Sequence, residues 1–157
     1  MTTLLNRPTK KSIRIVYSAL IMGLVFFSCM SFYLVHTTGP LGDFDEEAME
    51  YLLLVANMLP LIAIPTGIFI ARKRLSEIES TATAERLTQF QSAMIIRAAT
   101  IEASGYFFLV CFALTGIHLL LVEALVMITL QVYFFPNNMR LSRELKLDLR
   151  ELEKKQD

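Results

Sequence analysis

Four apolar segments, each about as long as a bilayer is thick, constrain this chain more than any other feature of its sequence. They cover residues 15–36, 51–71, 94–116 and 118–135. A membrane-spanning helix needs about 20 predominantly apolar residues, so each segment is close to the required length. In 157 residues there is room for four such spans and short connections, but not for a separate soluble domain. We therefore predict an all-α membrane protein with four transmembrane helices.

Turn and charge signals mark the ends of these segments. A Gly39-Pro40 pair follows the first, and three basic residues, 72–74, follow the second. Gly116 separates the third from the fourth, and Pro136 follows the fourth. We expect three regions, which are a cytoplasmic N-terminal segment at 1–14, a transmembrane domain at 15–136 and a cytoplasmic tail at 137–157.

The tail has the pattern of an amphipathic helix. Leucines recur in it at spacings of three and four residues among charges of both signs. We predict that this stripe docks on a partner or on the protein's own cytoplasmic surface, with lipid as the alternative. The residues concerned are Leu141, Leu145, Leu149 and Leu152.

Basic residues predict the orientation in the membrane. In a four-span topology all Lys and Arg residues fall on one side, while the loops on the other side hold none. The positive-inside rule then places both termini in the cytoplasm. The 15 Lys and Arg residues balance the 15 Asp and Glu residues, so no overall field points to nucleic acid as a partner. The expected surroundings are the lipid bilayer and other membrane-protein subunits.

An ionisable side chain, Glu102, lies well inside the third apolar segment. Such a residue is a functional-site candidate by default. Counted from the outer ends of their spans, Glu102 and Gln131 both lie about 20 Å deep, in a layer that also includes Gly23 and Pro65. Gln131 is the first candidate partner of Glu102.

Three further polar residues belong to this set of candidates. Glu123 and Asn57 share a shallower layer, about 8 or 9 Å deep, and Arg97 is the second candidate partner of Glu102. The pairs are expected to be interhelical contacts, worth about 0.6–2 kcal/mol each. The alternative is that Glu102 takes up and releases a proton.

Motifs for catalysis, cofactors and metals are absent from the sequence. It contains no P-loop, paired-glycine fingerprint, Ser-His-Asp order or His-Glu-x-x-His. The two histidines have no Cys/His cluster near them, so no metal site is predicted. Internal duplication is a further possibility, because LLLVANML at 52–59 and LLLVEALV at 119–126 occupy equivalent points of two helical hairpins.

Two stretches carry a resemblance to known proteins. The run IIRAATIEASGYFFLVCFALTG, followed by FFPNNMRLSRELKLD, resembles the third span and tail of small four-helix bacterial inner-membrane proteins of uncharacterised function. In that pattern Arg97 precedes an alanine-rich segment and Glu102. A fainter likeness is to the proteolipid ring subunits of rotary ATPases, in which Glu102 would match the intramembrane carboxylate. Their first helix is rich in glycine, whereas the first segment here has only Gly23.

These features favour a non-catalytic accessory or assembly subunit of a larger complex in the bacterial inner membrane. The resemblance implies that location, and the amphipathic tail offers a docking element. The second hypothesis is a proton- or ion-coupled carrier that uses Glu102. A small integral-membrane enzyme is the third.

Overall fold

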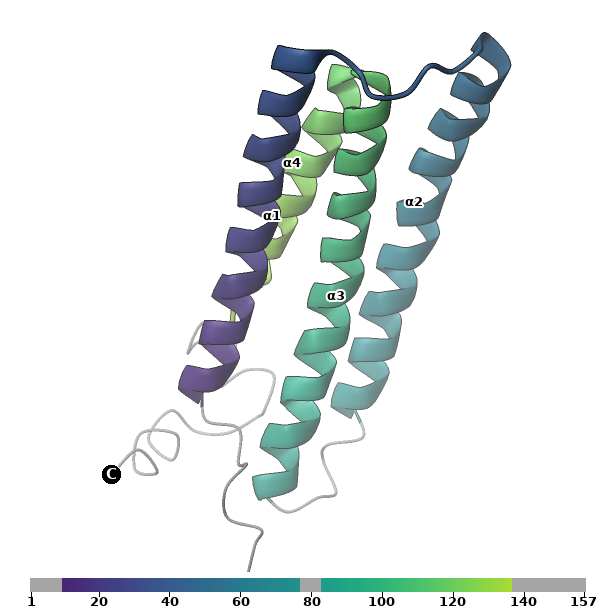
Figure 1. Ribbon diagram of the computed structural model, residues 1–157. Coiled ribbons are helices and arrows are strands. Elements are labelled where there is room, and N and C mark those ends of the chain that lie inside the picture. The colour runs from purple at the N-terminus through teal and green to yellow at the C-terminus, as the bar shows by residue number, and fades with distance from the viewer. Residues whose placement is uncertain (1–9, 77–82, 137–157) are drawn as a thin grey trace, which may run out of the picture.

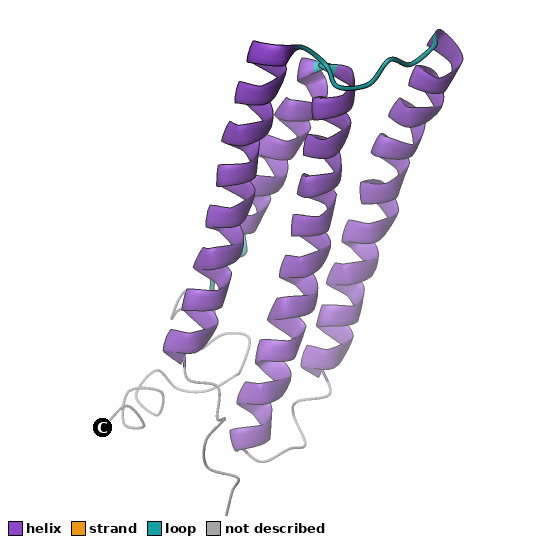
Figure 2. Ribbon diagram, viewed as in Figure 1, coloured by secondary structure: helices purple, strands orange, loops and turns teal. Residues whose placement is uncertain are grey.

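Four helices form the described part of the protein. The computed structural model describes residues 10–76 and 83–136, in which every regular element is α-helical (Figure 1, Figure 2). In chain order they are α1 (Lys10–Thr38), α2 (Glu46–Ser76), α3 (Thr83–Thr115) and α4 (His118–Tyr133). For these residues the prediction of an all-helical protein is confirmed, with helices at the places of the four predicted spans. The predicted tail at 137–157, with its four leucines, and residues 1–9 lie outside the described residues.

Three of the helices are long and apolar enough to cross a membrane. The qualifying stretches are Ile13–Thr38 in α1, Glu46–Ser76 in α2 and Phe90–Thr115 in α3. The helix α4 has only 16 residues, or about 24 Å at 1.5 Å per residue. That is shorter than the roughly 30 Å of a bilayer's hydrocarbon core. It ends at Tyr133, two residues before the predicted end of the fourth span.

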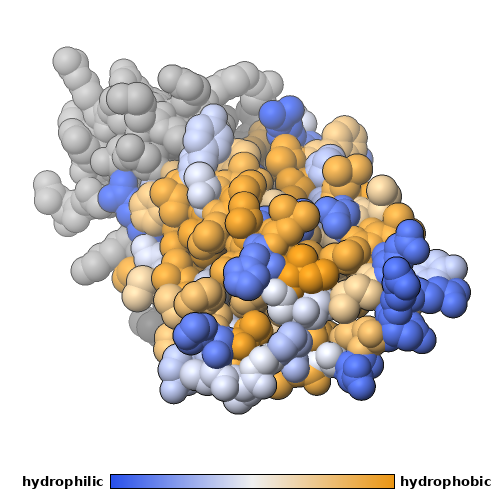
Figure 3. Space-filling view, turned by 90° about the horizontal axis from the view of Figure 1, so that it is seen from above, coloured by the Kyte–Doolittle hydropathy of each residue, from blue (hydrophilic) through white to orange (hydrophobic). Residues whose placement is uncertain are grey.

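Large apolar side chains cover much of the outside of the helices. Phe26 of α1 is 67% exposed, and Leu61 and Phe69 of α2 are 70% and 69% exposed. Monomeric soluble proteins rarely expose contiguous apolar patches of such extent, whereas a lipid bilayer solvates them. Seen from the end where α2 begins, the largest group of hydrophilic residues lies on the side of α2, and smaller ones are scattered among apolar residues (Figure 3). The surface is that of a membrane protein.

The helix α3 is the central element of the bundle. It packs against α1, α2 and α4, whereas α1 and α2 have almost no contact with each other (Figure 1). Small residues allow these close approaches. A Cβ atom on Gly67 of α2 would collide with Thr100 of α3, and one on Gly105 of α3 would lie 2.8 Å from a methyl carbon of Leu24.

Two apolar clusters fill the interior. The first cluster lies near the N-terminal end of α1 and comprises Ile13, Tyr17, Phe90, Met94 and Ala98. The second cluster comprises Leu24, Ala56, Phe108, Leu109, Cys111, Phe112, Leu120 and Ala124. Most of these residues belong to α3, which explains why its sequence combines bulky apolar and small residues.

The connection between α1 and α2 closes the C-terminal end of α3. The backbone N–H groups of Leu41 and Gly42 donate to the carbonyl oxygens of Ala113 and Leu114, at 3.0 and 2.9 Å. These carbonyls belong to the last turn of a helix, where no intrahelical donor is available. Gly116 follows with φ of +71°, a conformation that glycine adopts at little cost. The signal at Gly116 thus produces a tight turn into α4.

Candidate functional site

Glu102 lies at the seam between α3 and α1. Its side chain is partly buried, and Tyr106, one turn later on α3, donates a side-chain hydrogen bond to the carboxylate. The Tyr106 ring meets Phe27 of α1 edge-on, with 5.3 Å between ring centroids. A Cβ atom on Gly23 would lie 2.9 Å from the Tyr106 hydroxyl oxygen. Tyr106 therefore sits directly against the backbone of α1 at Gly23, and its hydrogen bond links Glu102 to this seam.

The depth prediction brought Gly23 and Glu102 into one layer, and the structure places them on the two sides of this seam. Tyr106 was not among the site residues predicted from the sequence. The spacing of four residues between Glu102 and Tyr106 could have indicated it, because residues at i and i+4 are neighbours on a helix surface.

Gln131, the predicted first partner of Glu102, lies elsewhere. Its side chain is fully buried in the bundle, at 0% exposure, and neither its amide nitrogen nor its amide oxygen has a hydrogen-bond partner. The two residues match in depth but are not joined by a hydrogen bond. A buried amide without a partner costs stability, so Gln131 is an unfavourable polar group in the interior.

The second predicted pair, Glu123 and Asn57, is not joined by a hydrogen bond through the Asn57 amide nitrogen or Glu123 Oε2. Asn57 is exposed, and its amide nitrogen donates to the carbonyl oxygen of Leu53 in its own helix, at 2.9 Å. Glu123 is partly buried, with a buried Oε2 that has no partner. The preceding residue, Ala56, is one of the buried residues of α2, and Asn57 is turned about 100° away from it.

Arg97 is directed to the end of α4. It is 6% exposed, and its guanidinium carbon lies 4.4 Å from the centroid of the Phe134 ring, a cation–π arrangement. Five residues separate Arg97 from Glu102, which places them about 140° apart around α3. Nearby, Arg14 Nε of α1 donates to the carbonyl oxygen of Pro136, at 3.3 Å. Cations near the C-terminus of a helix are favourable, so both arginines support this end of α4.

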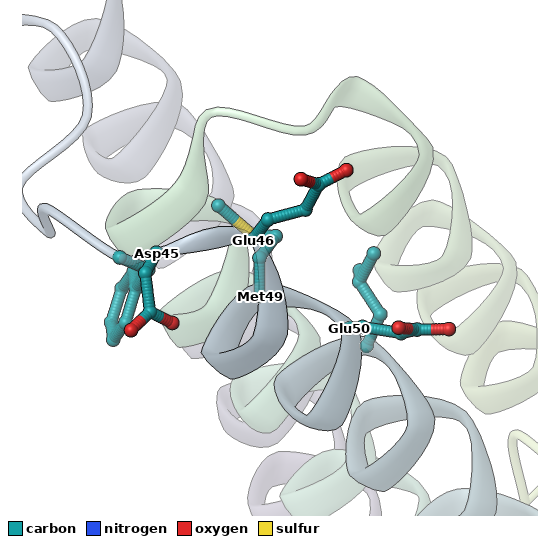
Figure 4. Close-up of a pocket in the computed structure, with 6 residues that line it drawn as sticks. Asp45, Glu46, Met49 and Glu50 are labelled. Atoms are coloured by element: carbon teal, nitrogen blue, oxygen red, sulfur yellow. The ribbon is translucent and has the colours of Figure 1, made fainter.

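The acidic residues at the start of α2 form no convergent site. Asp45 Oδ1 accepts a hydrogen bond from the Ala48 N–H, at 2.8 Å, which caps the helix. An open hollow lies beside this turn, lined by Phe44, Asp45, Glu46, Met49, Glu50 and Leu53. Figure 4 shows the carboxylate of Asp45 directed away from those of Glu46 and Glu50. These groups are a solvated charge run.

Neither a metal-binding cluster nor a similarity to known proteins indicates a function. Among residues 10–76 and 83–136, no group of three or more His, Cys, Asp or Glu side chains lies close enough to hold a metal ion. No protein-family model, curated protein or solved structure matches the chain. The seam with Glu102 and Tyr106 is therefore the candidate site on the strength of its own chemistry.

Proposed function

We propose that this protein is a non-catalytic accessory or assembly subunit of a larger complex in the bacterial inner membrane, with both termini in the cytoplasm. One observation supports the proposal most. The central helix α3 carries a partly buried carboxylate, Glu102, beside a side of the helix that neither α1 nor α2 covers. An ionisable residue at membrane depth requires partners. In an assembled complex another subunit supplies them.

Purification in mild detergent tests this function. A tagged chain, expressed at its natural level and extracted from its own membranes, should retain companion subunits at constant stoichiometry, as measured by native mass spectrometry. Removing the chain should also lower the abundance of the assembled companions. A pure homo-oligomer would contradict the proposal and favour a carrier or an enzyme.

The proton- or ion-coupled carrier is the second candidate, because Glu102 and Tyr106 are two ionisable groups that share a hydrogen bond at the seam. A carrier would lose proton uptake into proteoliposomes when Glu102 is replaced by Gln, which preserves shape but cannot exchange a proton. The subunit proposal expects no proton uptake by the unmodified chain. A flux that depends on Glu102 would replace it with the carrier.

The topology has a test of its own. Reporters fused at Thr2 and Asp157 should both read cytoplasmic, whereas a reporter inserted at Gly42 should read external. The decisive position is the C-terminus, because the 16 residues of α4 are short for a span. An external reading at Asp157 would show that α4 does not cross the membrane.

A further inference from the structure

One side of α3 is left uncovered between α1 and α2. Four exposed residues form a stripe along it, which we call the α3 face: Ile95, Ala99, Ala103 and Val110. Ile95 and Val110 are 43% and 44% exposed. The successive spacings of four, four and seven residues keep them on one side of the helix. Figure 1 shows α1 and α2 on the two sides of α3, with α4 behind.

The middle of the α3 face is shaped for close helix contact. Ala99 and Ala103 lie one turn apart and are both exposed. Small residues at this spacing let a second helix approach closely within a membrane. The bundle already uses the same device, because α2 packs on α3 through its own small residues, and Gly67 lies against Thr100.

Glu102 determines which charge a helix that binds the α3 face should carry. It precedes Ala103 and is partly buried, and Tyr106 supplies one hydrogen bond to its carboxylate. Two carboxylate oxygens offer about four acceptor positions. Ionisable groups at membrane depth pair with one another or with backbone groups. A cation on an approaching helix would complete the pairing.

We propose that the α3 face binds a transmembrane helix of another protein, and that this helix carries a Lys or Arg at the depth of Glu102. A second copy of this chain cannot supply that cation. In its own bundle Arg97 packs on Phe134 at the end of α4, and the other basic residues precede α1, follow α4, or lie near the end of α2 or the start of α1 and α3. This inference rests on the proposed function, because it assigns the contact surface and the partner chemistry of the accessory subunit.

A pair of model peptides provides the test. Each is a Leu/Ala transmembrane helix, and the two differ at one position, which holds Lys or Leu at the depth of Glu102. The full chain carries a fluorophore at Ser76→Cys, with Cys29 and Cys111 replaced, and is reconstituted with a labelled peptide in phosphatidylcholine vesicles. Energy transfer then reports association. We expect the Lys peptide to bind at least tenfold more tightly than the Leu peptide.

Variants of the protein locate the contact. Glu102→Gln should reduce binding of the Lys peptide to the level of the Leu peptide, whereas Glu123→Gln, which changes another intramembrane glutamate, should not. Ala103→Leu should block both peptides by filling the α3 face, and Thr129→Leu, at an exposed position on α4, should not. Because the Lys and Leu peptides are compared on the same labelled protein, the main result does not depend on how the Glu102 and Ala103 variants fold.

Three outcomes would overturn the inference. They are equal binding of the two peptides, a preference for Lys that survives Glu102→Gln, and self-association of the chain that depends on Ala103 and is displaced by neither peptide. The last outcome would assign the α3 face to a second copy. Companion subunits that stay bound in the Glu102→Gln and Ala103→Leu proteins would refute this surface and leave the proposed function standing. Peptide binding by a chain that has no companion subunits in its own membranes would refute the proposed function and leave this surface standing.

Discussion

Glu102 and Gln131 lie at about the same depth in the bundle, yet their surroundings are opposite. Glu102 is partly exposed at the seam of α1 and α3 and has a hydrogen bond from Tyr106. Gln131 is fully enclosed and has no partner. The group that could carry a charge is the one with access to the surface and a polar neighbour. Depth alone therefore does not identify a partner, because the direction in which a side chain leaves its helix decides what it meets.

The difference also separates a cost to the stability of the fold from a requirement for an outside partner. An enclosed amide without a partner destabilises the fold itself. A carboxylate at the edge of the bundle can be satisfied by something outside it, which makes Glu102 suitable for assembly and Gln131 unsuitable. Substitutions at Gln131, Glu102 and Tyr106 test this contrast, and their expected effects on stability decrease in that order.

The largest effect is expected at Gln131. Gln131→Leu removes a buried amide that has no partner and keeps a side chain of similar size, so it should stabilise the bundle by about 1–3 kcal/mol. Unfolding in mixed detergent micelles with increasing SDS measures the change in free energy. Leu130→Gln is the matched control, because it adds an amide at the neighbouring position and should not stabilise. A loss of stability in Gln131→Leu would show that a bound water satisfies this amide.

A smaller effect of opposite sign is expected at Glu102. Glu102→Leu removes the acceptor for Tyr106 and should weaken the bundle by about 1 kcal/mol. Glu102→Gln keeps an acceptor and should leave the unfolding free energy nearly unchanged. The same SDS titration compares the two variants. Equal losses in both would mean that the negative charge, rather than the hydrogen bond, holds the seam together.

Much of the fold was predictable because long apolar runs leave a membrane chain little choice except helices. Gly116 and the prolines after the first and fourth spans, Pro40 and Pro136, also marked real ends. The helix limits moved outward where polar residues continue a helix beyond the bilayer, as at the start of α3 near Thr83. They moved inward at α4, which stops at Tyr133, three residues before Pro136. Proline disfavours helical geometry in the residue before it, so Phe135, the predicted end of the span, lies outside the helix.

The candidate site was predictable only in part. Apolar context pointed to Glu102, and residue counting brought Gly23 to its depth. The partner of Glu102 and the direction of Gln131 depend on how the helices are rotated about their axes, which spacing along one helix does not define. The weak contact between α1 and α2, which exposes the α3 face, is likewise a result of tertiary packing. It has no signature in the sequence of either helix.

The smallest effect is expected at Tyr106. Tyr106→Phe removes only the hydroxyl that donates to Glu102 and keeps the ring against Phe27. Side-chain hydrogen bonds inside membrane bundles contribute about 0.6 kcal/mol on average, so the unfolding free energy should fall by roughly that amount. In the Glu102→Leu background the same substitution should have almost no effect, since the acceptor is already gone, and this double-mutant cycle isolates the bond. If Tyr106→Phe costs as much with Leu at position 102 as with Glu, the hydroxyl acts through its contact with Gly23 on α1 instead. The seam would then be held by packing, and Glu102 would have its whole acceptor capacity open to a partner.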